Sequence, residues 1–289
     1  MAKVLIAGFG DVGRRLARLL TQSGHEVLAG CRSEPEAEFR DLWVSLDLLQ
    51  AETFDQKLSE VDFVVYLPTP GARSEEAYRH IFCDGLHNLF EFVGADQAQW
   101  IFVSSTGVYG QCEGEFVDEK SVTNPKRYSG QILLEAEQWL LDQHQGDEAQ
   151  ACVVRLAGIY GPGRNRLLRL VAEGKPVCEQ PPYYTNRIHS EDAARLLQFL
   201  IEKKLLGENW RPHYLGVDDA PVTEYEVQQW IAKAMGVSTL PVENDGSKGQ
   251  NKRCQNQLIR GMGFDFLYPT YKEGYQLMVD EYLLGEDGR

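Results

Sequence analysis

The sequence predicts a doubly wound α/β fold, in which helices cover both faces of a parallel sheet, followed by a smaller C-terminal domain. Short apolar runs alternate with longer amphipathic stretches through the first half of the chain. The runs are apolar on both faces, which is typical of strands buried between two layers of helices. Beyond residue 163 the pattern changes to proline-rich loops and mixed helices. We therefore expect one domain at 1–162 and a second at 163–289, with 186–216 packing back on the first.

The individual elements follow from local periodicity. Strands are short runs rich in Val, Leu and aromatic residues, and they are expected at Lys3–Ala7, Val27–Gly30, Trp43–Leu46, Phe63–Leu67, Trp100–Ser104 and Ala151–Leu156. Helices are stretches in which apolar residues recur every three or four positions, and they are expected at Gly13–Ser23, Glu75–Val93 and Ser129–Gln143.

Composition excludes several classes of partner. The chain has 289 residues, and 43 acidic against 29 basic side chains give a net charge of −14. Nucleic acids and anionic membrane surfaces are therefore not expected partners. No apolar run approaches the ~20 residues of a membrane span, and the N-terminus lacks the pattern of a signal peptide. The six dispersed cysteines form no Cys-x-x-Cys pair, so we expect a cytoplasmic protein with free thiols and no metal site.

The segment after the first predicted strand has the pattern of a phosphate-binding turn. It reads Gly8-Phe9-Gly10-Asp11-Val12-Gly13 and leads into the first predicted helix. Gly8 allows the tight turn, Gly10 lets the backbone approach a pyrophosphate, and Gly13 lets helix and strand pack closely. The anion then lies on free N–H groups at the helix N-terminus. This context favours a dinucleotide site over a glycine turn without a ligand.

The end of the second predicted strand indicates which dinucleotide is preferred. An acidic residue there would bind the ribose 2′-hydroxyl of NAD, but this chain has Arg32 followed by Ser33. Arg32 can hold a 2′-phosphate through charge-assisted hydrogen bonds, and Ser33 adds a hydroxyl donor. The alternative is that Arg32 is only a solvated cation. We expect NADP to be preferred, with NAD as the second choice.

Further motifs continue the pattern along the chain. In order they are Asp47-Leu48, Leu67-Pro68-Thr69, Ser104-Ser105-Thr106-Gly107-Val108-Tyr109-Gly110, Arg155-Leu156-Ala157-Gly158-Ile159-Tyr160-Gly161-Pro162-Gly163 and Asn186-Arg187-Ile188-His189-Ser190-Glu191-Asp192. Together with the glycine turn they resemble the extended short-chain dehydrogenase/reductases, the NAD(P)-dependent epimerase/dehydratase family. The resemblance implies a Rossmann fold. It also implies cofactor contacts by Gly8, Phe9, Gly10, Asp11, Val12, Gly13, Asp47, Leu48, Leu67, Pro68, Thr69, Ser104, Leu156, Ala157, Gly158 and Ile159.

The catalytic residues that the resemblance implies are Ser105 and Tyr128. In the family, a tyrosine acts as acid and base on a substrate hydroxyl, and a lysine four residues later lowers its pKa and holds the nicotinamide ribose. A tyrosine of pKa about 10 needs such help at neutral pH, but the matching position is Ile132. Gln131 can still hydrogen-bond the ribose. In this the chain resembles the YeeZ-like branch, in which the pair is degenerate, so Tyr128 is either catalytic or an ordinary aromatic residue.

The substrate side carries fewer specific signals. Family members that use nucleotide sugars have an arginine ahead of the Ile-His pair, but Thr185 occupies that position and Arg187 directly precedes Ile188. Other cations on segments that the family folds over the cleft are Arg164, Arg166, Lys248 and Lys252. We expect Arg164, Arg187 and Lys252 to contact an anionic substrate group and the cleft to be positive, although a solvated role explains each cation better when it is considered alone. A structural role explains His189 and Asp192 better than a catalytic one.

Two functions remain open at this point. One is an NAD(P)-dependent oxidoreductase or epimerase that acts on a hydroxyl of a small, sugar-like or anionic substrate. The other is a catalytically silent NADP(H)-binding sensor or interaction protein, which Ile132 favours. The family often dimerises through its two long helices, here residues 75–93 and 129–143. Apolar residues that suit such a homodimer, or simply the core, are Phe82, Leu86, Leu89, Phe90, Leu133 and Leu140.

Overall fold

A computed structural model describes residues 1–144, 149–244 and 249–286. The chain folds into two compact units, and it passes between them several times. The first unit contains residues 1–108, 123–155 and 194–214, and the second contains 109–122, 156–193 and 215–289. The predicted domains, 1–162 and 163–289, differ from these units. Residues 109–122 belong to the second unit, and residues 194–214 belong to the first.

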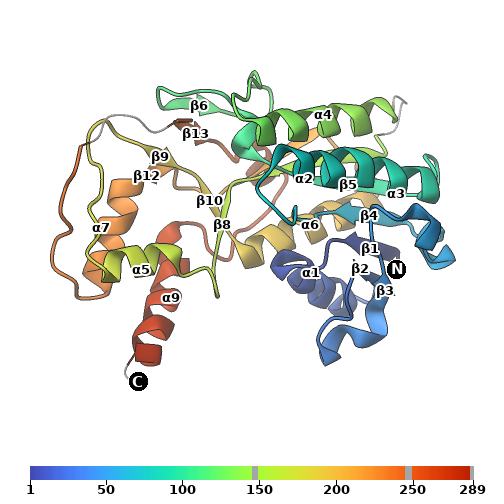
Figure 1. Cartoon of the computed structure of the whole chain (residues 1–289), viewed down its shortest axis with the longest axis horizontal. Coiled ribbons are helices and arrows are strands. Elements are labelled where there is room, and N and C mark those ends of the chain that lie inside the picture. Colours follow the sequence, from blue (N-terminus) through green and yellow to red (C-terminus); the bar gives the residue numbers. More distant parts are fainter. Residues whose placement is uncertain (145–148, 245–248, 287–289) are drawn as a thin grey trace. The chain divides into compact units, whose positions relative to one another are not determined.

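A seven-stranded sheet forms the centre of the first unit (Figure 1). Its order is β11-β7-β5-β4-β1-β2-β3, and the pairings of β1 with β2 and β4, of β2 with β3, and of β4 with β5 are parallel. The strands are β1 (Lys3–Ala7), β2 (Glu26–Cys31), β3 (Trp43–Ser45), β4 (Phe63–Tyr66), β5 (Gln99–Ser105), β7 (Ala151–Leu156) and β11 (His213–Gly216). The predicted doubly wound fold and its six predicted strands are confirmed. The seventh strand, β11, lacked a recognisable pattern in the sequence.

Helices cover the two faces of this sheet. They are α1 (Asp11–Gln22), α2 (Glu75–Arg79), α3 (Gly85–Val93), α4 (Tyr128–Asp142) and α6 (Ser190–Leu205). Figure 1 shows α2, α3 and α4 on one side of the sheet and α1 on the other. The long helix predicted at 75–93 is interrupted by a π turn at His80–Asp84 (η4). None of the described helices combines the length and apolar character needed to cross a membrane.

A buried ion pair attaches α4 to the sheet. The Glu137 carboxylate of α4 accepts hydrogen bonds from Arg155 Nε at 3.1 Å and Arg155 Nη2 at 2.7 Å, and both side chains are almost fully buried. His213 of β11 lies 3.9 Å from the same carboxylate. Burial and the nearby Arg155 charge nevertheless lower the pKa of His213 to about 4, because Arg155 already neutralises Glu137. The pair fixes the helix that begins with Tyr128.

The described residues of the second unit form three two-stranded sheets and four helices. Its strand pairs are β6 (Glu115–Val117) with β13 (Lys252–Cys254), β8 (Gly158–Tyr160) with β10 (Arg187–His189), and β9 (Tyr184–Thr185) with β12 (Val222–Thr223). Its helices are α5 (Arg166–Ala172), α7 (Glu224–Ala234), α8 (Gln257–Gly261) and α9 (Tyr271–Glu286). Tyr160, Leu168, Val227, Ile231 and Tyr275 belong to the apolar core between these elements.

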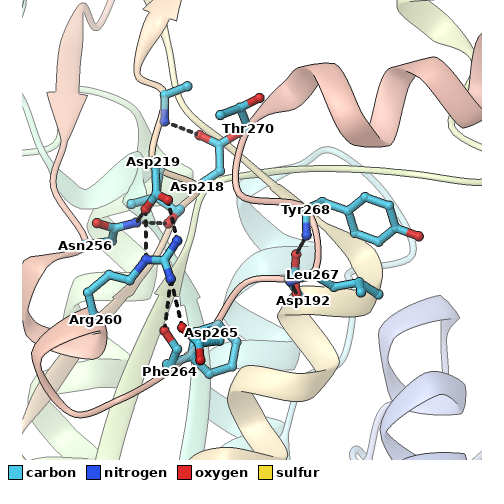
Figure 2. Close-up of polar contacts among 12 residues, drawn as sticks. Asp192, Asp218, Asp219, Asn256, Arg260, Phe264, Asp265, Leu267, Tyr268 and Thr270 are labelled. Atoms are coloured by element: carbon cyan, nitrogen blue, oxygen red, sulfur yellow. Dashed lines mark hydrogen bonds and ion pairs between the residues drawn. The ribbon is translucent and has the colours of Figure 1, made fainter.

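Carboxylates connect the C-terminal segment to the rest of the second unit, as Figure 2 shows. The buried Asp192 side chain accepts hydrogen bonds from the backbone N–H groups of Leu267 at 2.7 Å and Tyr268 at 2.8 Å. Asp219 accepts hydrogen bonds from Asn256 Nδ2 at 2.7 Å and from Arg260. These contacts give Asp192 a structural role within this unit.

Asp218 and Arg187 bring opposite charges into the interior of the same unit. Their exposed fractions are 1% and 5%, and Asp218 Oδ2 and Arg187 Nη1 have no hydrogen-bond partner among the described residues. Asp218 Oδ1 accepts a hydrogen bond from the N–H of Ala220 at 3.1 Å. Burial raises the pKa of Asp218 to about 7, although Arg187 opposes this shift. The carboxyl group is therefore partly protonated at neutral pH.

Replacing Asp218 tests this buried carboxyl group. In the unfolded chain an Asp has a pKa of about 3.9, so the stability that protonation of Asp218 contributes is full below that pH and is lost as the pH rises through about 7,. Asp218→Asn does not titrate, and its stability relative to wild type should rise between about pH 5 and about pH 8. Chemical denaturation at both pH values measures the difference. Parallel stability curves for the two proteins would contradict the buried, proton-binding carboxyl.

Candidate functional site

A pocket in the first unit brings together nine of the nineteen residues expected to bind the cofactor. It has a volume of about 280 Å³ and lies where β1, β2 and β4 end. The lining residues are Gly8, Phe9, Gly10, Gly30, Cys31, Arg32, Leu46, Asp47, Leu48, Leu49, Leu67, Pro68, Thr69, Gly71 and Ile81. Among them one base, Arg32, and one acid, Asp47, carry charge. We expected a positive cleft, but this lining is close to neutral. It is not acidic.

The three glycines of the turn have different surroundings. Gly8 has a φ of +108°, and a Cβ atom on it would lie 2.5 Å from the backbone nitrogen of Pro68. A Cβ on Gly13 would lie 2.8 Å from the carbonyl oxygen of Gly8. Around Gly10, by contrast, a Cβ would meet no atom within 4 Å. Gly8 and Gly13 are therefore required by packing, whereas Gly10 borders space that a ligand can fill.

The N-terminus of α1 faces this space without a side-chain cap. Gly10 is the N-cap residue and supplies no side-chain cap. Asp11 in the first turn is paired with Arg15 at 2.9 Å. Phe9 and Val12 are buried, and the Phe9 ring packs edge-on against Phe39. The residues fit a dinucleotide pyrophosphate because the first-turn N–H groups are oriented toward open space.

Arg32 is an available cation at the edge of the pocket. Its side chain is exposed, and no hydrogen bond or ion pair of this side chain is found among the described residues. Two other arginines of this unit are paired, Arg18 with Glu38 and Arg40 with Glu34. Cys31 beside it is half-buried, and burial raises the pKa of its thiol. Cys31 was not predicted, since a lone cysteine at a strand end carries no motif.

The expected catalytic side chains lie at the end of β5 and the start of α4. Ser104 Oγ is buried and has no hydrogen-bond partner among the described residues, whereas Ser105 Oγ accepts a hydrogen bond from the N–H of Gly107 at 3.0 Å. The Tyr128 hydroxyl donates a hydrogen bond to the backbone carbonyl of Arg73 at 2.9 Å. Sequence reasoning missed this contact with Arg73. It ties Tyr128 to the loop that begins with the pocket residues Thr69 and Gly71.

The helix positions after Tyr128 provide no replacement for the family lysine. Ile132 is 1% exposed and packs in the core of the first unit. Gln131 is exposed, and its side-chain amide donates a hydrogen bond to the carbonyl of Pro125 at 3.2 Å. Gly130 allows the helix start to approach the Ser105 loop, because a Cβ there would lie 2.7 Å from the carbonyl oxygen of Gly107.

Ser33 is exposed after β2 and does not line the pocket, and the remaining predicted residues belong to the second unit. Leu156 and Ala157 are buried, and Gly158 and Ile159 lie on β8. Arg164 is exposed just before α5. Lys248 lies outside the described residues. The contacts of these side chains with a cofactor or a substrate stay predictions.

Two of the cations expected to bind substrate are buried inside the second unit. Arg187 donates a hydrogen bond to Thr185 Oγ1, and its guanidinium lies 5.7 Å from the centre of the Tyr271 ring. Lys252 is 6% exposed and donates a hydrogen bond to Gln250 Oε1 at 3.3 Å. Burial lowers the pKa of Lys252. Both side chains need to move before they can contact a substrate anion.

Comparisons with known proteins agree with this arrangement. A sequence model described as the NAD dependent epimerase/dehydratase family matches residues 4–219. A proposed NAD-dependent epimerase/dehydratase from Methylobacillus flagellatus is 30% identical, with a TM-score of 0.79 over 98% of this chain and 99% of that chain. None of the curated protein sequences matches the chain.

More distant structures share the fold. The dTDP-glucose 4,6-dehydratase of Bacillus anthracis, in complex with NAD, is 18% identical, with a TM-score of 0.79 over 99% of this chain and 98% of its own. The UDP-glucose 4-epimerase of Thermotoga maritima, with UDP-glucose, is 15% identical, with a TM-score of 0.79 over 98% of this chain and 99% of its own. The comparisons do not separate the branches of the superfamily, so the YeeZ-like assignment stays a prediction.

Two glycine substitutions separate the fold from ligand binding. Gly8→Ala should destabilise the first unit by about 1–3 kcal/mol, because its Cβ overlaps Pro68 and its φ is unfavourable,. Gly10→Ala should leave the melting temperature unchanged but weaken dinucleotide binding about tenfold or more, since its methyl group enters the space next to the helix N-terminus. Thermal denaturation and cofactor titration measure the two effects. A Gly10→Ala protein that binds the dinucleotide like wild type would disprove the assigned position of the pyrophosphate.

Proposed function

Because the chain belongs to the NAD-dependent epimerase/dehydratase family, we propose that it is a nicotinamide-dependent oxidoreductase or epimerase. Its cofactor occupies the pocket of the first unit, and its substrate carries a reactive hydroxyl group. The observation that carries this proposal is the pocket itself. The phosphate-binding turn, the strand end with Arg32 and the segment Leu67–Thr69 all line it, although they are far apart in the sequence.

The cofactor is NADP in preference to NAD. Arg32 lines the pocket and has no competing partner among the described residues. A free guanidinium is suited to a 2′-phosphate, because it offers several N–H donors and keeps its charge at every physiological pH. Asp47 lies on the same lining, after β3 and not at the end of β2, where an acid would select the ribose hydroxyl of NAD.

Ser105 and Tyr128 act on the reacting oxygen. The nicotinamide, when bound, supplies or accepts the hydride of the substrate carbon. Tyr128 exchanges a proton with the substrate oxygen through its hydroxyl, and Ser105 hydrogen-bonds the same oxygen. For this step the Tyr128 hydroxyl has to exchange its bond to the Arg73 carbonyl for one to the substrate. Gln131, exposed on the first turn of α4, is the remaining side chain able to hydrogen-bond the nicotinamide ribose.

The substrate is a small, sugar-like or anionic molecule. Fold relatives act on dTDP-glucose or bind UDP-glucose, which supports a sugar-like group. Thr185 occupies the position of the family arginine that grips a diphosphate, and the neighbouring Arg187 is hydrogen-bonded to it. A nucleotide diphosphate would therefore lack the arginine that binds it in the family. Arg164 is exposed just before α5 and is a candidate contact for an anionic substrate group.

A catalytically silent NADP(H)-binding protein is the second candidate. The burial of Ile132 at 1% exposure favours it, because no charge stands where the family lysine lowers the pKa of the tyrosine. The hydrogen bond from Tyr128 to Arg73 also favours a silent protein, because it occupies the Tyr128 hydroxyl. Such a protein would respond to cofactor binding through its loops and would bind a partner, a second copy included, without turnover. In both cases we expect the protein to work in the cytoplasm.

Cofactor preference is tested by titrating NADP and NAD into wild type and Arg32→Ala. Wild type should bind NADP more tightly, and the variant should lose about ten- to hundredfold in NADP affinity with little change for NAD, since one charge-assisted contact is removed. Arg40→Ala is the matched control, because Arg40 is exposed but paired with Glu34 outside the pocket. Tighter binding of NAD to wild type would remove the role given to Arg32.

Turnover separates the two candidate functions. A panel of alcohols, sugars and hydroxy acids with NADP should give cofactor reduction that Tyr128→Phe lowers at least about a hundredfold in kcat, which is the scale of acid–base catalysis. The variant should keep the melting temperature of wild type. Full activity of Tyr128→Phe would exclude this residue from the mechanism. Tight NADP binding with no turnover over the whole panel would support the silent protein.

A further inference from the structure

A second arginine lies next to the wall of the dinucleotide pocket. Arg14 is in the first turn of α1, and its N–H donates to the carbonyl of Gly10 at 2.9 Å. Gly10 lines the pocket. Residues four apart share one face of a helix, and side chains tilt toward the helix N-terminus. The Arg14 side chain therefore extends along α1 toward the pocket, although it is not part of the lining.

The thiol of Cys31 shows that this guanidinium is near the end of β2. Cys31 lines the pocket between Gly30 and Arg32. Burial is the main cause of the raised pKa of its thiol; the charge of Arg14 lowers this pKa, and the charge of Glu36 raises it. Coulomb interactions weaken with distance. Both charges therefore lie close to the strand end at which a dinucleotide places its adenine ribose.

The partner of Arg14 is Glu36, on the loop that follows β2. Arg14 Nε lies 3.1 Å from Glu36 Oε2, but this buried nitrogen makes no hydrogen bond among the described residues, so its N–H is not aligned with the carboxylate. The two side chains are 37% and 60% exposed. An ion pair that water reaches from both sides, and that lacks an aligned hydrogen bond, contributes little stability. A stronger anion can therefore take the place of Glu36.

Other contacts hold the same loop on α1. Arg18, one helical turn further on, donates two hydrogen bonds to the Glu38 carboxylate, at 2.7 Å and 2.8 Å. Its guanidinium also lies 4.9 Å from the centre of the Phe39 ring. Phe39 is buried and packs edge-on against Phe9. The loop can therefore stay in place when Glu36 separates from Arg14.

The 2′-phosphate of NADP has the chemistry to replace Glu36. A phosphate monoester carries a charge of about −1.5 to −2 at pH 7 and three acceptor oxygens, whereas a carboxylate has one charge and two oxygens. A guanidinium binds either group through paired N–H donors. Arg32 approaches the end of β2 from the strand, and Arg14 approaches it from the helix. Two cations are thus available for one phosphate group.

We propose that Arg14 is a second residue that selects NADP, and that the 2′-phosphate binds its guanidinium in place of the Glu36 carboxylate. The inference rests on the proposed function, because it assigns a further residue to the same cofactor site. NAD has a hydroxyl group at this position and leaves the pair of Arg14 and Glu36 intact. Glu36 competes with the phosphate for Arg14 and so limits the preference for NADP.

Titration of NADP and NAD into two single variants tests this competition. Arg14→Gln should weaken NADP binding about tenfold, and Glu36→Gln should strengthen it about threefold or more, with NAD affinity unchanged in both. A role limited to attaching the loop would shift both variants in the same direction and for both cofactors. Arg18→Gln and Glu38→Gln are the matched controls, because they remove the same charges one turn further along α1. Both controls should bind like wild type.

The double variant Arg14→Gln/Glu36→Gln separates competition from a general effect of charge. Its NADP affinity should match that of Arg14→Gln within about twofold, because Glu36 acts through Arg14. Additive effects of the two substitutions, or an equal loss of NADP and NAD affinity in Arg14→Gln, would overturn the inference. If Arg32→Ala weakens NADP binding but neither single variant changes it, the inference fails and the proposed function stands. If neither dinucleotide binds wild type, the proposed function itself fails, and this role of Arg14 fails with it.

Discussion

The close approach of two backbones at Gly8 and Pro68 determines the geometry of the first unit. Residues 7 and 66 are paired between β1 and β4, and the N–H of Leu67 continues this ladder by donating to the carbonyl of Ala7 at 2.9 Å. The N–H of Gly8 donates to the carbonyl of Gly30 at 3.0 Å on the opposite side. Three strands therefore end at one level, and their loops diverge around a common space. A side chain at Gly8 would separate these strand ends and remove the pocket.

The first unit was largely predictable from sequence because its strands are buried on both faces and are continuously apolar. β7 shows this most clearly, since all six of its residues are buried and its predicted bounds match the structure. β11 has four residues and no flanking pattern, so its place at the sheet edge depends on tertiary contacts. The π turn was hidden for a related reason. The wider π turn accommodates its inserted residue, so the apolar spacing of 75–93 continues through it.

Local motifs predicted the pocket well, but contacts across the chain could not be predicted in the same way. The lining from Gly8 to Thr69 follows from short segments whose backbone conformation is encoded locally. The bond from Tyr128 to Arg73 joins residues 55 positions apart through a carbonyl that every residue has, so no residue type signals it. Arg187 and Lys252 show a different limit. Charge is visible in sequence, whereas the direction of a side chain is set by the packing around it.

The nearly neutral lining of the dinucleotide pocket has a kinetic consequence. An anionic cofactor approaching this pocket would meet the field of a protein with a net charge of −14, while in the proposed complex backbone N–H groups and Arg32 would hold its phosphates at close range. At low ionic strength the long-range repulsion slows the encounter. Salt at about 0.1 M shortens the range of that field to about 10 Å. The field of the acidic surface is then weak at the helix N-terminus. Added salt should therefore speed cofactor capture, the reverse of a site that attracts its ligand electrostatically.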